Sequence, residues 1–168
     1  MRPARAVLLV AALLFLVNIW GYDLWAPDEP FFGEGAREMV VDGRWLVTHV
    51  NGDVNTHKPP LFFWLIALLS LPLGRVTSLT ARLPSALAAL GTVAMVLRIG
   101  RRWSSERTAV LAAFVLATSY MFWDKARTAQ IDAVMCALIW VALSAFLAWR
   151  ADDLDGRRAG LVFWGAGA

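Results

Sequence analysis

IDAVMCALIWVALSAFLAW, residues 131–149, is the stretch that decides the fold, because Asp132 at its start is its only charged residue. As a helix rising about 1.5 Å per residue, such a run nearly matches a hydrocarbon core of about 30 Å. Similar runs cover residues 6–22, 83–99 and 109–123, and another starts at residue 159. Hydrophobic residues make up 59% of the 168 and occur in blocks, as expected when lipid is the solvent. The sequence therefore predicts an all-α integral membrane protein.

The net charge of the chain is small, and its basic residues are placed as in proteins whose orientation in the membrane they determine. The formal net charge is +3, and the arginines cluster in short connectors beside the apolar runs. This pattern is typical of residues that orient a membrane protein, and it argues against a nucleic-acid partner. The single cysteine, Cys136, lies within an apolar run, so we expect a packing residue and no internal disulfide.

The first apolar run, residues 6–22, stands where a signal peptide would stand. No cleavage site of small residues follows it, and Trp20, Tyr22 and Trp25 suit the aromatic belt at a membrane interface. We therefore expect an uncleaved helix with a cytoplasmic N-terminus. The long polar segment that follows, residues 23–60, is then external.

A shorter apolar run, residues 61–73, follows Pro59-Pro60 and contains Pro72. Its length as a helix is roughly 20 Å, which is short of the hydrocarbon core, so we expect an interfacial or short re-entrant helix. If it does not cross, the connector at residues 124–132 shares the outer face with residues 23–60. The basic segments 1–5, 98–107 and 150–158 then lie together in the cytoplasm, as the positive-inside rule favours. Crossing by a tilted helix is the alternative.

Within residues 23–60, a short amphipathic helix is expected to lie on the membrane and to end at Gly43. Its apolar face would be formed by Phe32, Ala36, Met39 and Val40. Asp28 and Glu29 precede it, and Asp28 as a helix cap is the structural alternative to a chemical role.

The segment ends with His57-Lys58-Pro59-Pro60, which holds a cation at the start of an apolar helix. A rigidly held lysine at headgroup depth suits a lipid phosphate, although a lysine that only anchors the helix end is the alternative. Similarly, Arg127 is either a phosphate contact or an interfacial anchor, and Asp132 is either a site residue or a helix cap.

Several motifs occur in the order and spacing of a known family. They are LWAPDEP at 24–30, AREM at 36–39, GRWLV at 43–47, Asn51-Gly52, KPPL at 58–61, ARLPSAL at 81–87, and ARTA at 126–129 with Asp132. Together they resemble the amino-terminal part of the protein mannosyltransferase-like membrane glycosyltransferases. The bacterial aminoarabinose (lipid A) transferases are the most similar type within this group.

This resemblance implies a GT-C-type multi-pass helical bundle with an amphipathic juxtamembrane helix in its first external loop. Such proteins pass a sugar from a polyprenyl-phosphate donor to a lipid, glycan or protein acceptor, outside the bacterial cytoplasmic membrane. By match to the family motifs, Asp28 is the catalytic carboxylate, supported by Glu29 and Asp132. The candidate donor-phosphate cations are Lys58, Arg127 and Arg37, and His57 is a candidate ligand of a divalent metal ion.

The chain departs from the family pattern at two places. Many members carry a basic and then an aromatic hydroxyl residue where this chain has Phe31-Phe32, and many carry Glu where it has His57. The first change removes a possible phosphate contact, and the second changes a possible metal ligand from carboxylate to imidazole.

Two other classes of function are compatible with the composition. A truncated, non-catalytic relative would bind polyprenyl phosphate or act as a subunit. A transporter or channel would normally bury ionisable residues inside its spans, and the predicted spans carry almost none.

Overall fold

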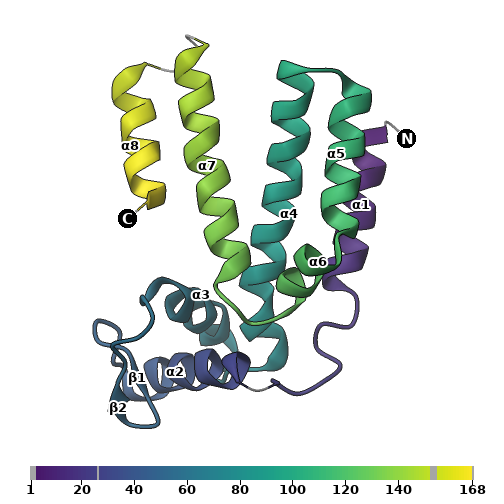
Figure 1. Ribbon diagram of the computed structural model, residues 1–168. Coiled ribbons are helices and arrows are strands. Elements are labelled where there is room, and N and C mark those ends of the chain that lie inside the picture. The colour runs from purple at the N-terminus through teal and green to yellow at the C-terminus, as the bar shows by residue number, and fades with distance from the viewer. Residues whose placement is uncertain (1–2, 26, 152–154, 168) are drawn as a thin grey trace.

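The computed structural model describes residues 3–25, 27–151 and 155–167, and they form a helical protein with one small hairpin. The long helices run side by side (Figure 1): α1 (Pro3–Leu16), α4 (Ser78–Trp103), α5 (Glu106–Thr118), α7 (Asp132–Arg150) and α8 (Gly156–Gly167). At one end, α2 (Asp28–Asp42) and α3 (Leu61–Ser70) lie across the direction of these helices. The hairpin β1 (His49–Val50) and β2 (Asp53–Val54), the turn η1 (Leu71–Leu73) and the short α6 (Tyr120–Arg127) complete this end.

Two helices in the described part of the chain, α4 and α7, are long and apolar enough to cross a membrane. α1 and the run Leu61–Leu73 are apolar but shorter. α3 lies across the bundle axis in Figure 1, as expected for an interfacial helix. The α4–α5 connection, the end of α7 and the start of α8 lie at the end where α1 begins, and the α6–α7 connection lies at the end of α2 and α3. That residues 61–73 do not cross the membrane stays a prediction.

The bundle is packed mainly through small side chains. Ala11 of α1, Ala89 of α4, and Ala113 and Ala117 of α5 are fully buried in one apolar cluster. Alanines let helix backbones approach closely, which is how helices in lipid gain packing energy without a hydrophobic driving force between them.

A second cluster joins the transverse helices to each other. Phe32 of α2 packs edge-on against Phe62 of α3, with ring centroids 4.9 Å apart, and it also contacts Phe63. Gly35 allows this approach, because a Cβ at that position would come within 2.5 Å of the Phe63 ring. The predicted apolar face of α2 is confirmed, since Phe32, Ala36 and Met39 are buried and Val40 packs against the same cluster.

The carboxyl end of α2 agrees with the sequence prediction, and its amino end does not. Gly43 ends the helix in a left-handed conformation with φ of 71°, and its N–H bonds the Met39 carbonyl at 3.1 Å, as predicted. However, the helix begins at Asp28, and no side chain caps it. Asp28 as a helix cap is therefore wrong, because its carboxylate accepts a hydrogen bond from another segment.

Three predicted spans have different bounds. Residues 6–22 form a helix only to Leu16, and the chain then turns through Asn18, which has φ of 59°. Residues 109–123 are divided at Ser119, whose extended backbone separates α5 from α6. Residues 83–99 extend to 78–103, because Thr77 forms a capping box with Thr80 and starts the helix five residues earlier. The longer α4 brings Arg82 inside the helix.

Candidate active site

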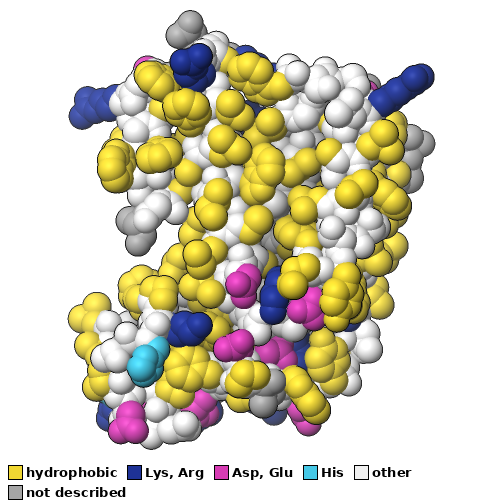
Figure 2. Space-filling view, viewed as in Figure 1, with side chains coloured by type: hydrophobic (Ala, Val, Ile, Leu, Met, Phe, Trp, Pro, Cys, Tyr) yellow, Lys and Arg dark blue, Asp and Glu magenta, His cyan; other side chains and the backbone are white. Residues whose placement is uncertain are grey.

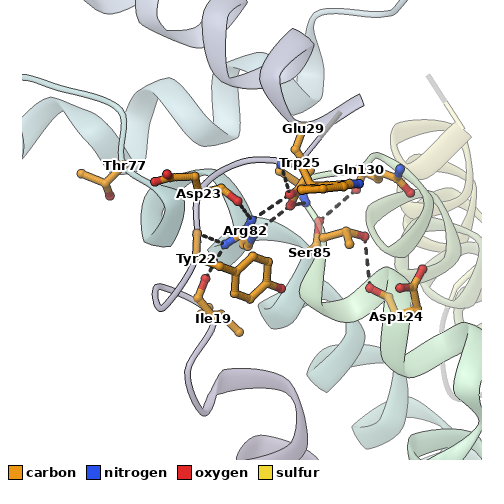
Figure 3. A network of polar contacts seen from close by, with 12 residues as sticks. Ile19, Tyr22, Asp23, Trp25, Glu29, Thr77, Arg82, Ser85, Asp124 and Gln130 are labelled. Carbon is orange, nitrogen blue, oxygen red and sulfur yellow. Dashed lines mark hydrogen bonds and ion pairs between the residues drawn. The ribbon is translucent and has the colours of Figure 1, made fainter. Parts of the chain in front are cut away.

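A buried ion pair lies where α2, α4 and the first loop meet (Figure 3). Arg82 of α4 is fully buried, and it donates through Nε and Nη2 to Oε1 and Oε2 of Glu29, both at 2.7 Å. Such forked pairing fixes orientation as well as charge. Glu29 is 3% exposed, and it accepts two more hydrogen bonds, from the backbone N–H of Trp25 at 2.8 Å and of Ala129 at 2.7 Å. The carboxylate therefore joins three segments of the chain.

The remaining donors of Arg82 hold the loop that follows α1. Nη1 bonds the carbonyls of Ile19 and Tyr22 at 2.8 and 2.9 Å, and Nη2 bonds the Asp23 carbonyl at 2.8 Å. The guanidinium also lies 3.8 Å from the centroid of the Tyr22 ring, within cation–π range. A guanidinium carries five donors in a fixed fork. Arg82 alone can therefore bind three carbonyl groups of this loop, whose residues 17–25 form no helix.

Glu29 stays ionised in this environment. Burial by itself would raise the pKa of its carboxyl, but the Arg82 hydrogen bonds, the Trp25 and Ala129 amides and the Arg82 charge together hold it below its ordinary value of 4.5. A carboxylate with both oxygens occupied is a poor proton acceptor. The geometry of Glu29 therefore favours a structural role, in which it positions the start of α2 and the neighbouring carboxylate of Asp28.

That neighbour, Asp28, is held differently. Its Oδ2 accepts a 2.8 Å hydrogen bond from Nε2 of Gln130, and Oε1 of Gln130 accepts a 2.5 Å bond from Lys125 Nζ. Asp28 is only half-buried, and its Oδ1 has no partner within residues 3–25, 27–151 and 155–167. One oxygen is thus oriented while the other remains available. This contact and the Ala129–Glu29 contact confirm that the connector at 124–132 lies at the same end as Asp28.

Lys58 lies near the turn of α2 that follows Asp28. Its Nζ is 6.0 Å from the centroid of the Phe32 ring, and Phe32 follows Asp28 by one helical turn. Residues four apart on a helix are neighbours on its surface, so the side chain that Lys58 approaches is a neighbour of Asp28 on α2. In the described residues, Lys58 has no ion-pair partner.

The loop that carries Lys58 is held rigidly by Asn55. Its Oδ1 accepts the backbone N–H groups of His57 and Lys58, and its Nδ2 donates to the Lys58 carbonyl at 3.0 Å. The preceding hairpin turns at Asn51 and Gly52, as predicted, with φ of 58° and 83°. The Gly52 N–H bonds Glu38 of α2 at 2.9 Å, which ties the hairpin to the helix that carries Asp28.

Two predicted site residues, Arg37 and Arg127, are bound elsewhere. Arg37 lies nine residues after Asp28 on α2, about 14 Å along the axis, and pairs with Glu34 on the exposed face. Arg127 donates to the carbonyls of Leu14 and Val17 at 2.7 and 2.9 Å, so it binds the end of α1. Its role as a phosphate contact stays a prediction.

Asp132 and His57 are both exposed. Asp132 begins α7 two residues after Gln130, so it lies beside the segment that contacts Asp28. His57 precedes Lys58 in the fixed loop. Among the described residues, no group of three or more His, Cys, Asp or Glu side chains is arranged to hold a metal ion. His57 as a metal ligand stays a prediction without a set of companion ligands in this part of the chain.

Figure 2 shows the setting of these groups. Positive and negative side chains gather where the α2–α3 layer meets the bundle, beside a hollow that separates this layer from α8. The three residues that sequence reasoning did not assign, Arg82, Gln130 and Lys125, all belong to the network at this junction. Arg82 could have been identified from the sequence, because an arginine within an apolar helix requires a buried partner.

Comparison with known proteins places this geometry in context. Residues 57–168 match the family described as dolichyl-phosphate-mannose-protein mannosyltransferase. Undecaprenyl phosphate-alpha-4-amino-4-deoxy-L-arabinose arabinosyl transferase from Pseudomonas aeruginosa is 30% identical over 165 residues, covering 97% of this chain and 30% of the relative. The protein of the same description from Pectobacterium carotovorum is 31% identical, over 96% of this chain and 29% of the relative.

The fold also has solved counterparts. Crystal structures of ArnT from Cupriavidus metallidurans, one bound to undecaprenyl phosphate and one in the apo state, superpose with a TM-score of 0.86 at 24% identity. The alignment covers 96% of this chain and 30% of the solved chain. The chain therefore spans about 30% of the length of the relatives that it matches.

Proposed function

Because this chain belongs to the dolichyl-phosphate-mannose-protein mannosyltransferase family, we propose that it transfers a sugar from a polyprenyl-phosphate donor to an acceptor. The observation that supports this proposal is that α2 begins with a half-buried carboxylate, Asp28, oriented by Gln130, and has the Lys58 cation 6.0 Å from the Phe32 ring on its next turn. The proposal extends to a GT-C-type fold in the bacterial cytoplasmic membrane, with this end of the molecule facing the periplasm.

In the proposed reaction, Asp28 acts as the general base. Its free oxygen removes the proton from an acceptor hydroxyl or amine while the acceptor forms a bond to the anomeric carbon of the sugar. The bond from that carbon to the carrier phosphate breaks, and its electron pair stays on the phosphate. A single displacement of this kind inverts the anomeric centre.

The leaving phosphate gains negative charge, which a fixed cation can stabilise. Lys58 suits this role because its loop is held by Asn55, and a preorganised charge needs no rearrangement during the reaction. Arg127, Arg37 and Asp132 belong to the same proposal as further contacts to donor or acceptor. Glu29 and Arg82 fix the segment between α1 and α2, so that Asp28 begins its helix at a defined place.

The experiment uses cells with and without the gene, and mass spectrometry of their lipids and glycans. A sugar-modified lipid or glycan that disappears with the gene names both sugar and acceptor. Asp28→Asn keeps the hydrogen bond from Gln130 but removes the base, so we expect loss of the product with normal membrane insertion. Wild-type product levels in that variant would exclude Asp28 as the base.

A second candidate function is binding without transfer, which the exposed Lys58 cation beside Phe32 would also serve. In this alternative, the protein binds polyprenyl phosphate through Lys58, or pairs with another subunit, without transferring a sugar. Mass spectrometry of the same strains distinguishes the two functions, because removing the gene of a protein that only binds polyprenyl phosphate leaves the lipids and glycans unchanged. Its binding of polyprenyl phosphate would nevertheless depend on Lys58.

A further inference from the structure

The end of the bundle opposite Asp28 carries a pocket between α1 and α4. Its volume is about 380 Å³, and its floor includes Ala4 and Leu97, which are buried. Arg5 of α1 and Arg98 and Arg101 of α4 border it. The antiparallel course of the two helices brings the start of α1 next to the end of α4, so three arginines from distant parts of the sequence meet there.

These arginines are weakly compensated. No carboxylate lines the pocket, and neither Arg5 nor Arg98 has an ion-pair partner in the part of the chain that the structure describes. Arg101 pairs with Glu106, but their side chains are 42% and 53% exposed, so solvent screens this ion pair. A phosphate group can therefore replace Glu106 as the partner of Arg101. The described carboxylates at this end are Glu106 and Asp155, whereas Figure 2 shows dark blue side chains along it.

The depth of the pocket matches a lipid headgroup. α4 has 26 residues and is about 39 Å long, which exceeds a hydrocarbon core of about 30 Å. The last turns of α4, with Arg98 and Arg101, therefore reach the headgroup region. A basic rim over an apolar floor at that depth has the chemistry of an anionic phospholipid site, since guanidinium groups bind phosphate with paired hydrogen bonds.

We propose that the headgroup of an anionic phospholipid binds in this pocket, with its phosphate between Arg5, Arg98 and Arg101 and its glycerol region on the apolar floor. The proposal is independent of the proposed transfer, because the pocket lies at the opposite end of the bundle from Asp28. Its effect would be to hold α1 against α4.

The test titrates the full chain in detergent with phosphatidylglycerol or phosphatidylcholine at about 150 mM salt and counts bound lipids by native mass spectrometry. We expect the wild type to retain phosphatidylglycerol at least tenfold more tightly. Arg5→Gln and Arg98→Gln should each weaken its binding about tenfold, the size expected for one lost charge-assisted hydrogen bond. Arg107→Gln is the matched control, since Arg107 lies at the same end and does not line the pocket.

Several results would overturn the proposal. One is equal retention of the two lipids by the wild type, which needs no variant to fold. Another is an equal loss in Arg107→Gln and Arg5→Gln, since this would mean diffuse attraction by the whole basic end. Release of the lipid by inorganic phosphate would identify a phosphate site instead. A loss in Arg102→Gln but not in Arg5→Gln would move the site to the larger cleft between α4 and α7, which Arg102 lines.

Discussion

The side-chain amide of Gln130 donates a 2.8 Å hydrogen bond to Asp28, across 102 positions of sequence. The same amide accepts from Lys125 at 2.5 Å, so a positive charge is linked to the carboxylate through a neutral group. Asp28 is thereby oriented without being neutralised by a direct ion pair. This distinction matters for a general base, because a carboxylate in a tight ion pair gives up much of its basicity.

Gln130→Ala should therefore reduce transfer while leaving donor binding unchanged. A hydrogen bond to a charged group contributes roughly 1.5–3 kcal/mol, so we expect a fall in kcat of about tenfold or more. The measurement is kcat and KM in membranes that contain the variant. Thr128→Ala is the control on the same connector, because the Thr128 hydroxyl donates to the Asp124 carbonyl and, among the described residues, does not contact Asp28. A change in KM alone would contradict the positioning role.

Lys58→Ala should weaken use of the donor. Without the cation, the leaving phosphate loses its stabilisation, and we expect kcat/KM for the donor to fall by roughly 100-fold, as when one preorganised donor is removed. Arg75→Ala provides the comparison, since Arg75 is exposed at the same end of the molecule and lies outside the site. Equal effects of the two substitutions would mean that Lys58 acts only through general surface charge.

Arg82→Met should strongly destabilise the protein. Removing one partner of a buried ion pair leaves an uncompensated charge, which costs about 3–5 kcal/mol. The double variant Glu29→Gln with Arg82→Met should regain part of this loss, because no buried charge then remains. Thermal unfolding in detergent measures both. If the double variant were no more stable than Arg82→Met, the pair would not be the source of the effect.

The stability of the protein should also fall in acid through Glu29. Its pKa is lower in the folded state than its ordinary value of 4.5, so the stabilisation is fully present above about pH 4.5 and is lost as the pH falls through the lower, folded-state pKa. Melting temperatures between pH 7 and pH 3 check this. Glu29→Gln should flatten the acid part of the curve, whereas Glu106→Gln, at an exposed pair, should keep the wild-type dependence.

Labelling of introduced cysteines tests which end faces outward. In a Cys136→Ser background, Asp53→Cys in the hairpin should react with an impermeant maleimide from the periplasmic side. Ser104→Cys between α4 and α5 should react only after the membrane is opened. Both positions are exposed, so access to the reagent is set by the membrane. The reverse pattern would invert the proposed orientation.

Much of this architecture could be predicted from the sequence, because apolar blocks and basic connectors report directly on lipid and orientation. The surface helix ending at Gly43 and the turn at Asn51-Gly52 were predictable for local reasons of the same kind. The alternative interpretation of Asp28 as a helix cap is wrong, because capping is inferred from neighbours in sequence. The partner of Asp28 is Gln130, and no local pattern indicates a contact between residues 102 positions apart.

The bounds of the helices failed for a related reason. α1 stops at Leu16 because the carbonyls of Leu14 and Val17 are taken by Arg127, and Trp123 also donates to Leu14. Hydropathy alone continues the helix to residue 22, since the competing donors come from more than a hundred residues away. The end of α1 is therefore set by long-range polar contacts, which the apolar pattern of the sequence does not show.

The Glu29 carboxylate also fixes the order in which this region is completed during synthesis. Arg82 lies 53 residues after Glu29, and the Ala129 amide lies 100 residues after it. Ribosomes add about 5–20 residues per second, so roughly 5–20 s separate the emergence of Glu29 from that of its last partner. During that interval the first loop has reached the membrane surface with an unmatched acid. The contacts of Glu29 are therefore complete only after residue 129 has emerged.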